Sequence, residues 1–159
     1  MKKTLKVVLM FAMAVLVVAC NKPEKDELAG TWRWTSTTGG IAGVNYTPES
    51  EGFNAEIVFK SGRFTFYKDG RKVTSGPYQV AYDVDKMKGD EKGPSYIWFS
   101  LHFHEAQCRA ISKATDGIIS INPDNSATIA IYDDQTERQV LSFGSSHLSD
   151  RFYYSFEKE

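Results

Sequence analysis

Apolar residues recur at every second position through much of this chain, and a period of two is the spacing of a strand with one buried face. Segments 55–60, 63–67 and 78–84 show it most clearly. Asp69-Gly70 lies between the second and third of these segments, and both residues tolerate the positive φ of a two-residue hairpin turn. The pattern predicts an antiparallel meander of three strands in the first half of the chain.

The second half of the sequence continues in the same way, and Glu105–Lys113 alone has the pattern of a short helical turn. Many short strands with one apolar face need an architecture that hides the core and the sheet edges. We therefore predict one all-β domain, an antiparallel up-and-down β-barrel, with a two-sheet β-sandwich as the alternative. The later strands are expected at 96–104, 117–122, 127–132, 138–143 and 151–157, with 117–122 paired to 127–132 across residues 123–125.

The first residues have the pattern of a secretory signal, a basic start followed by an apolar run from Val7 to Ala19. That run is shorter than the roughly 20 residues that a membrane-spanning helix needs. Val17-Val18-Ala19-Cys20 resembles the bacterial lipobox, where the signal is cleaved before a cysteine that carries acyl chains such as palmitate. We therefore expect lipid on Cys20, and an ordinary signal peptide with a chance cysteine is the alternative.

This interpretation divides the chain into a signal peptide (1–19), a lipidated flexible tether (20–27) and a barrel domain (28–159). Cleavage removes three lysines, so Lys plus Arg falls from 19 to 16 against 20 Asp plus Glu, and the formal net charge falls from −1 to −4. A mildly acidic domain argues against a nucleic-acid partner. Because each buried methylene contributes about 0.8 kcal/mol, the acyl chains would hold the protein at a membrane. We expect an outer-membrane lipoprotein that faces the periplasm or the cell exterior.

Gly30-Thr31-Trp32 follows the tether and resembles the G-x-W motif that opens the first strand of lipocalins. Over residues 28–82 the chain is similar to the lipocalin-like lipoproteins of Bacteroidota. The resemblance implies that Trp32 packs across a closed end of the barrel beneath a basic residue of the last strand. Arg151 is the first candidate for that basic residue and Lys158 the second. The chain departs from the family in lacking a clear middle motif and a long C-terminal helix.

The resemblance also implies a barrel that binds or carries a small hydrophobic molecule. Bulky inward side chains are compatible with an apolar pocket that has tyrosine hydroxyls as polar groups, and equally with a barrel filled solid. The rival hypothesis is a non-catalytic interaction module that uses the loops at 39–54 and 85–95. The inward-facing candidates for ligand binding are Trp34, Phe59, Phe64, Phe66, Tyr78, Tyr82, Phe99 and Phe103.

Three further residues carry chemistry of their own. His102 and His104 would point the same way on a strand, but two imidazoles do not complete a metal site, and surface histidines are the alternative. Cys108 stands beside Arg109, which would favour a thiolate, whereas a buried cysteine would behave as a small apolar residue. The sequence shows no nucleophile elbow, phosphate loop or HExxH motif. We therefore predict a protein without catalytic activity, cofactor or metal, and keep as a third hypothesis an enzyme whose catalytic residues are scattered over the barrel and form no motif.

Overall fold

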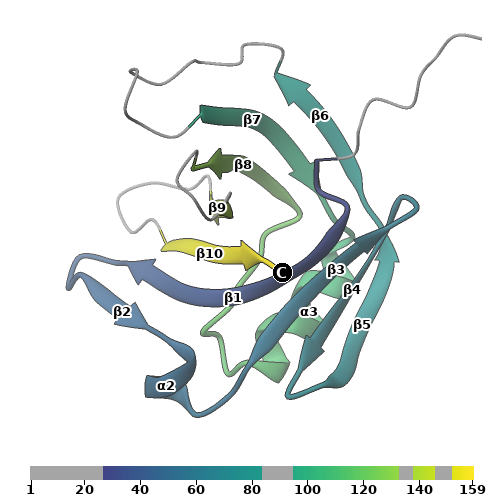
Figure 1. Cartoon of the computed structure of the whole chain (residues 1–159). Helices are drawn as coiled ribbons and strands as arrows, with labels where there is room; N and C mark the ends of the chain where they lie inside the picture. Colours follow the sequence, from purple (N-terminus) through teal and green to yellow (C-terminus); the bar gives the residue numbers. More distant parts are fainter. Residues whose placement is uncertain (1–26, 84–94, 133–137, 146–151) are drawn as a thin grey trace, which may run out of the picture.

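The computed structural model describes residues 27–83, 95–132, 138–145 and 152–159, which form a mostly β structure with two helices (Figure 1). The helices are α2 (Pro48–Glu51) and α3 (Glu105–Ala114). The strands are β1 (Gly30–Gly39), β2 (Val44–Tyr46), β3 (Ala55–Lys60), β4 (Arg63–Lys68), β5 (Arg71–Pro77), β6 (Gln79–Asp83), β7 (Ser95–His102), β8 (Asp124–Ile131), β9 (Gln139–Ser145) and β10 (Phe152–Lys158).

The strands form one antiparallel sheet in the order β5-β4-β3-β1-β10-β9-β8-β7-β6, with β2 added beside β1. The first and last strands pair in the middle of this order, Trp32 with Lys158, and the two ends of the order, β5 and β6, follow each other in the chain, so the sheet curls round on itself. Tyr78 alone separates β5 from β6, and the two follow one continuous path in Figure 1. The first part of this path pairs with β4 and the second with β7. The result is a nearly closed up-and-down barrel, as the periodicity predicted.

The meander in the first half is β3–β4–β5, and its turn at Asp69-Gly70 has positive φ at both residues (50° and 72°). The third strand of this meander was predicted wrongly, because it is Arg71–Pro77 and not 78–84. Arg71–Pro77 has no regular apolar alternation, and its one buried residue is Gly76. The predicted segment 78–84 contains β6 instead. This strand stands at the opposite end of the strand order from β5 and pairs with β7.

Segment 117–122 was predicted as a strand, and this too is wrong. Ile119 and Ile121 are buried, which produces a period of two, but the segment pairs with no strand. The backbone N–H of Ile119 donates to the Thr115 hydroxyl (3.2 Å) rather than to a sheet. β8 pairs with β7 and β9, so the predicted hairpin across residues 123–125 does not form.

The predicted helical turn is a full helix of ten residues, α3, which packs against β5. Gln107 Nε2 donates to the Ser75 carbonyl oxygen (3.2 Å) on the edge of β5 that faces no strand. An added Cβ at Gly76 would lie 1.6 Å from that same nitrogen, so the glycine makes room for the helix. In this way α3 covers the sheet edge at the place where the barrel is not closed by hydrogen bonds.

Candidate functional site

The N-terminal end of β1 is closed by Trp32, which is fully buried. Its indole Nε1 donates to the Leu28 carbonyl (2.7 Å), and Lys158 Nζ lies 5.1 Å from the ring centroid. Gly30 has a φ of 130°, and a Cβ there would lie 3.1 Å from Lys158 Cε. The G-x-W spacing therefore has a physical basis, because the glycine leaves room for the lysine that covers the indole.

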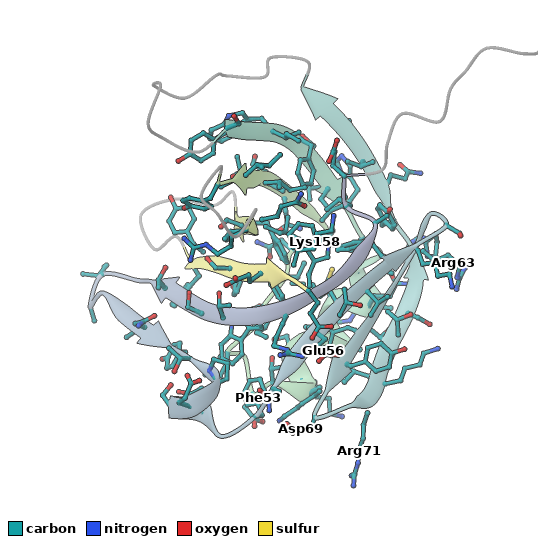
Figure 2. All side chains as sticks on the ribbon, in the orientation of Figure 1. Phe53, Glu56, Arg63, Asp69, Arg71 and Lys158 are labelled. Atoms are coloured by element: carbon teal, nitrogen blue, oxygen red, sulfur yellow. The ribbon has the colours of Figure 1, made fainter. Side chains whose placement is uncertain are left out.

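Of the two basic residues predicted to cover Trp32, Lys158 occupies the position, and Figure 2 shows it at the end of the last strand. Its ammonium also donates to the carbonyl of Glu27 (3.2 Å), the last residue of the predicted tether. Arg151 lies outside the described residues, as does Cys20, so its lipidation stays a prediction.

The predicted interior ligand residues are mostly packed against other aromatic rings. Trp34 stacks on Phe53 with centroids 5.1 Å apart, and Phe64 meets Phe103 edge to face at 4.6 Å. Tyr78, which is half-buried, meets Phe59 in the same way at 5.0 Å. Most of these rings therefore pack against one another, but Tyr78 and Phe103 also line a small pocket of about 160 Å³. The side chain of Tyr82 lies outside the described part. Six of the candidates are at most 7% exposed, namely Trp34, Phe59, Phe64, Phe66, Phe99 and Phe103.

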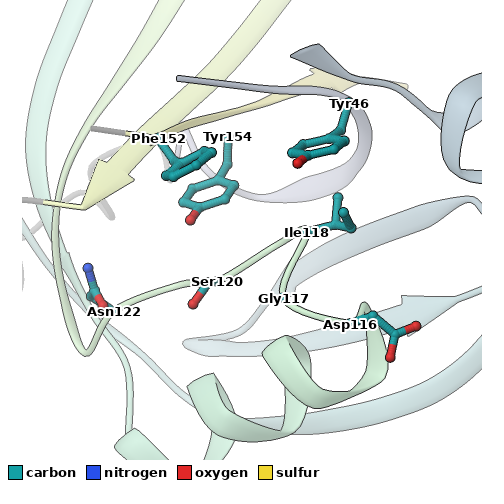
Figure 3. Close-up of a pocket in the computed structure, with 8 residues that line it drawn as sticks. All are labelled: Tyr46, Asp116, Gly117, Ile118, Ser120, Asn122, Phe152 and Tyr154. Carbon is teal, nitrogen blue, oxygen red and sulfur yellow. The ribbon is translucent and has the colours of Figure 1, made fainter. Parts of the chain in front are cut away.

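A pocket of about 370 Å³ lies at the other end of β1, and we call it the mouth pocket. Figure 3 shows three aromatic rings along one of its walls, Tyr46 from β2 and Phe152 and Tyr154 from β10. β1 holds these rings together because Thr37 pairs with both Tyr46 and Tyr154. The remaining lining residues come from the segment between α3 and β8 and are Asp116, Gly117, Ile118, Ser120 and Asn122.

Thr115, which is fully buried, organises this second wall. Its hydroxyl donates to the Ile111 carbonyl (3.0 Å) and accepts from the Ile119 N–H (3.2 Å). Between these contacts Asp116 and Gly117 both adopt positive φ (50° and 82°), which turns the chain sharply. Ile119 consequently enters the core while its neighbours on the segment line the pocket.

The polar groups of the mouth pocket are mainly uncharged. Burial raises the pKa of Tyr154, and a hydrogen bond with the Ser120 backbone lowers it by less. The Tyr154 hydroxyl therefore keeps its proton well beyond neutral pH. Asp116 is the one charged side chain among the eight that line the pocket.

Sequence reasoning did not find the mouth pocket. Phe152 and Tyr154 stand two apart on the last strand, which is the signal for a shared face. Nothing in the sequence shows that Tyr46, about a hundred residues earlier, joins them. The second wall could not be recognised because the alternation of residues 117–122 predicts a strand there.

β7 ends at His102, whose Nδ1 lies 2.6 Å from Asp124 Oδ1. His104 precedes α3, where its backbone N–H donates to Gln107 Oε1 (3.2 Å). The strand is therefore two residues shorter here than predicted, yet both histidines line the small pocket of about 160 Å³ that Tyr78 and Phe103 also line. Within the described residues no three His, Cys, Asp or Glu side chains are grouped as metal ligands.

Cys108 is buried in the hydrophobic core, on the inner side of α3. Burial raises the pKa of its thiol to about 11, so the protonated form prevails at neutral pH. The prediction of a small apolar residue is therefore confirmed, and the activated thiolate is excluded as a description of this site.

No protein-family model, curated protein or solved structure matches this chain. In the described part of the chain, no helix is both long and apolar enough to cross a membrane.

Proposed function

We propose that this chain is a lipid-anchored protein of the bacterial outer membrane that binds or carries a small, largely apolar molecule. The observation that supports this most directly is the mouth pocket, where three aromatic rings and an isoleucine surround about 370 Å³. Ligand pockets of proteins usually measure about 300–1,000 Å³ and combine apolar walls with a few polar groups. The mouth pocket has that size, and its lining combines the three rings and Ile118 with a polar share that is larger than usual, from Asp116, Ser120, Asn122 and exposed polar atoms.

The same geometry favours a ligand at the mouth over one deep in the barrel. The interior rings contact each other at centroid distances of 4.6–5.1 Å, and a ligand among them would have to separate them. Separating packed rings loses their dispersion and edge-to-face contacts. The mouth pocket needs no such rearrangement.

Phe152 and Tyr153 provide a matched pair of variants for a test. They are neighbours on β10, but Phe152 lines the pocket and Tyr153 is 48% exposed on the outer face. We would purify the full-length protein and its Phe152→Ala and Tyr153→Ala variants from the host membrane, extract each with organic solvent, and compare the extracts by mass spectrometry. A compound present with the wild type and Tyr153→Ala but lost with Phe152→Ala is expected. Identical extracts from all three would contradict binding at this pocket.

The lipid anchor is tested separately by Cys20→Ala. This substitution removes the thiol that acyl chains would modify, so the protein should lose its acylated N-terminal peptide and keep residues 1–19. Intact-mass spectrometry of the protein from the membrane fraction measures both. An unmodified Cys20 in the wild-type protein would contradict the anchor.

A second candidate function is an interaction module, and Ile41 is the observation that favours it. This residue is 88% exposed at the tip of the β1–β2 hairpin, within the predicted loop 39–54. An isolated exposed apolar residue at a loop tip suits insertion into a partner protein. Cross-linking in cells, with a photoreactive residue at position 41 and another at position 45 as control, would show whether a single protein partner contacts this tip. The other predicted loop is 85–95, and its residues 85–94 lie outside the described residues.

A further inference from the structure

The mouth pocket discriminates by charge. Asp116 is the one charged side chain among its described lining residues, and Figure 3 shows the carboxylate at one end of the pocket, pointing away from Phe152 and Tyr154. Among these described residues, a ligand with a carboxylate or phosphate group would meet no cation and would approach an anion. Moving such a group out of water without a partner is strongly unfavourable. The pocket therefore disfavours fatty acids and other anionic amphiphiles.

The walls also discriminate by shape. The rings of Tyr46, Phe152 and Tyr154 lie along one side, and Ile118 projects from the segment opposite (Figure 3). Both walls are held in place, the first by β1 pairing and the second by the hydrogen bonds of Thr115. Aromatic faces make their best contacts with another flat ring, stacked or edge to face. A fixed space between an aromatic wall and an aliphatic side chain suits a planar ring system.

Tyr154 adds a directional polar contact. The Ser120 backbone lowers the pKa of Tyr154, which only a group that donates to the phenolic oxygen does, so the partner is the Ser120 N–H and the phenolic oxygen is the acceptor. The hydroxyl hydrogen of Tyr154 remains to be donated, and the residue lines the pocket. An oxygen atom on a bound ring would accept that hydrogen.

From these three features we propose that the mouth pocket binds an uncharged, planar ring compound, and that Tyr154 donates a hydrogen bond to a carbonyl or hydroxyl oxygen on it. This inference depends on the function proposed above and narrows its ligand class. It separates the protein from carriers of fatty acids, whose carboxylate would need a basic residue in the site.

Three bicyclic probes of similar size test it: coumarin, which is neutral and carries a carbonyl; naphthalene, which has no oxygen; and 2-naphthoate, which is an anion. Binding is measured by equilibrium dialysis of the full-length lipidated protein in nanodiscs, with empty nanodiscs to subtract partitioning into lipid. We expect coumarin to bind roughly twofold to tenfold more tightly than naphthalene, the effect of one net hydrogen bond. We expect 2-naphthoate to bind most weakly.

Tyr154→Phe should abolish the preference for coumarin over naphthalene, so that the ratio of the two affinities falls to about one. Tyr67→Phe, on the outer face of β4, is the matched control and should keep the preference. Naphthalene binding without a preference for coumarin, or a preference that survives in Tyr154→Phe, would overturn this inference and leave the proposed function intact. Tightest binding of 2-naphthoate would overturn the ligand class. Binding of none of the three would overturn both proposals.

Discussion

The two ends of β1 differ in how completely they are packed. At Trp32 the indole has a carbonyl acceptor on one edge and a lysine over its face, and the side chain is fully buried. At Thr37, about 17 Å further along the strand, the neighbouring strands carry Tyr46 and Tyr154 beside an open pocket. The same strand therefore supports a closed end, next to the tether, and an open end that holds the candidate site. The comparison suggests that the closed end contributes mainly to stability and the open end mainly to binding.

The largest effect that we predict separates these roles at the closed end. Trp32→Ala should lower the free energy of unfolding by about 3–5 kcal/mol, because it leaves a large cavity and removes the contact with Lys158. Urea denaturation followed by far-UV circular dichroism measures this. Trp98→Ala is the control, since Trp98 is 45% exposed on β7, and it should change stability by less than about 1 kcal/mol. Equal losses in the two variants would show that the end at Trp32 is not a packed core.

A smaller loss is expected when the wall of the open end is loosened. Thr115→Val keeps the shape of the side chain but removes the hydroxyl that bonds Ile111 and Ile119. It should lower the free energy of unfolding by about 1–3 kcal/mol, because the Ile119 N–H loses its acceptor in a buried place. It should also weaken coumarin binding, which a change at the closed end should not do.

Thr65→Val, on the outer face of β4, is the matched control for that experiment. It should leave both the unfolding free energy and the binding of coumarin near their wild-type values. A Thr115→Val protein with normal stability and normal binding would show that this hydroxyl does not position the wall.

Lys158→Met tests how much the positive charge of Lys158 adds to the free energy of unfolding, beyond the packing of its aliphatic chain on Trp32. Methionine keeps much of the aliphatic length but loses the ammonium over the indole and its hydrogen bond to Glu27. We expect a loss of about 1 kcal/mol in unfolding free energy, within the usual range for a partly buried cation–π pair. Lys72→Met, on the exposed part of β5, should change it by less than about 0.5 kcal/mol. A matching change in both would contradict a specific role for Lys158.

The closed end was more predictable from the sequence than the open end, for a physical reason. Gly30 and Trp32 are two residues apart, so a local motif contained both, and Lys158 was one of two basic residues near the end of the last strand. The open end combines residues from β2, β10 and the 116–122 segment, and its geometry depends on a hydroxyl bond at Thr115 that competes with strand pairing. Alternation predicts that a side chain is buried but does not say which strand pairs with it.

For the same reason, alternation could not predict how the barrel interior is packed. Alternation correctly placed Phe64 and Phe66 inside the barrel, yet it could not show whether they line a space or fill it. That outcome depends on α3, which brings Cys108 and Ile111 into the core from a part of the chain predicted as a single turn. The core aromatic residues were therefore identified correctly, while their contact with a ligand stays a prediction. Of the described candidate rings, those of Tyr78 and Phe103 line a small pocket.

The smallest predicted effect concerns Cys108 and tests whether the interior between the two ends excludes water. It is a change of stability with pH that appears only above about pH 9 and not at neutral pH. Burial raises the pKa of Cys108 from 9.0 to about 11, so the folded state holds this proton more tightly than the unfolded state. The resulting stability is fully present below pH 9 and is lost as the pH rises from 9 through 11. Because other groups titrate in this range, the measurement is the difference in unfolding free energy between wild type and Cys108→Ala, which should fall by roughly 1–3 kcal/mol between pH 8 and pH 11. A difference that does not change with pH would mean that water reaches the thiol, and the interior would then be an open cavity rather than the filled core that separates a closed end from an open one.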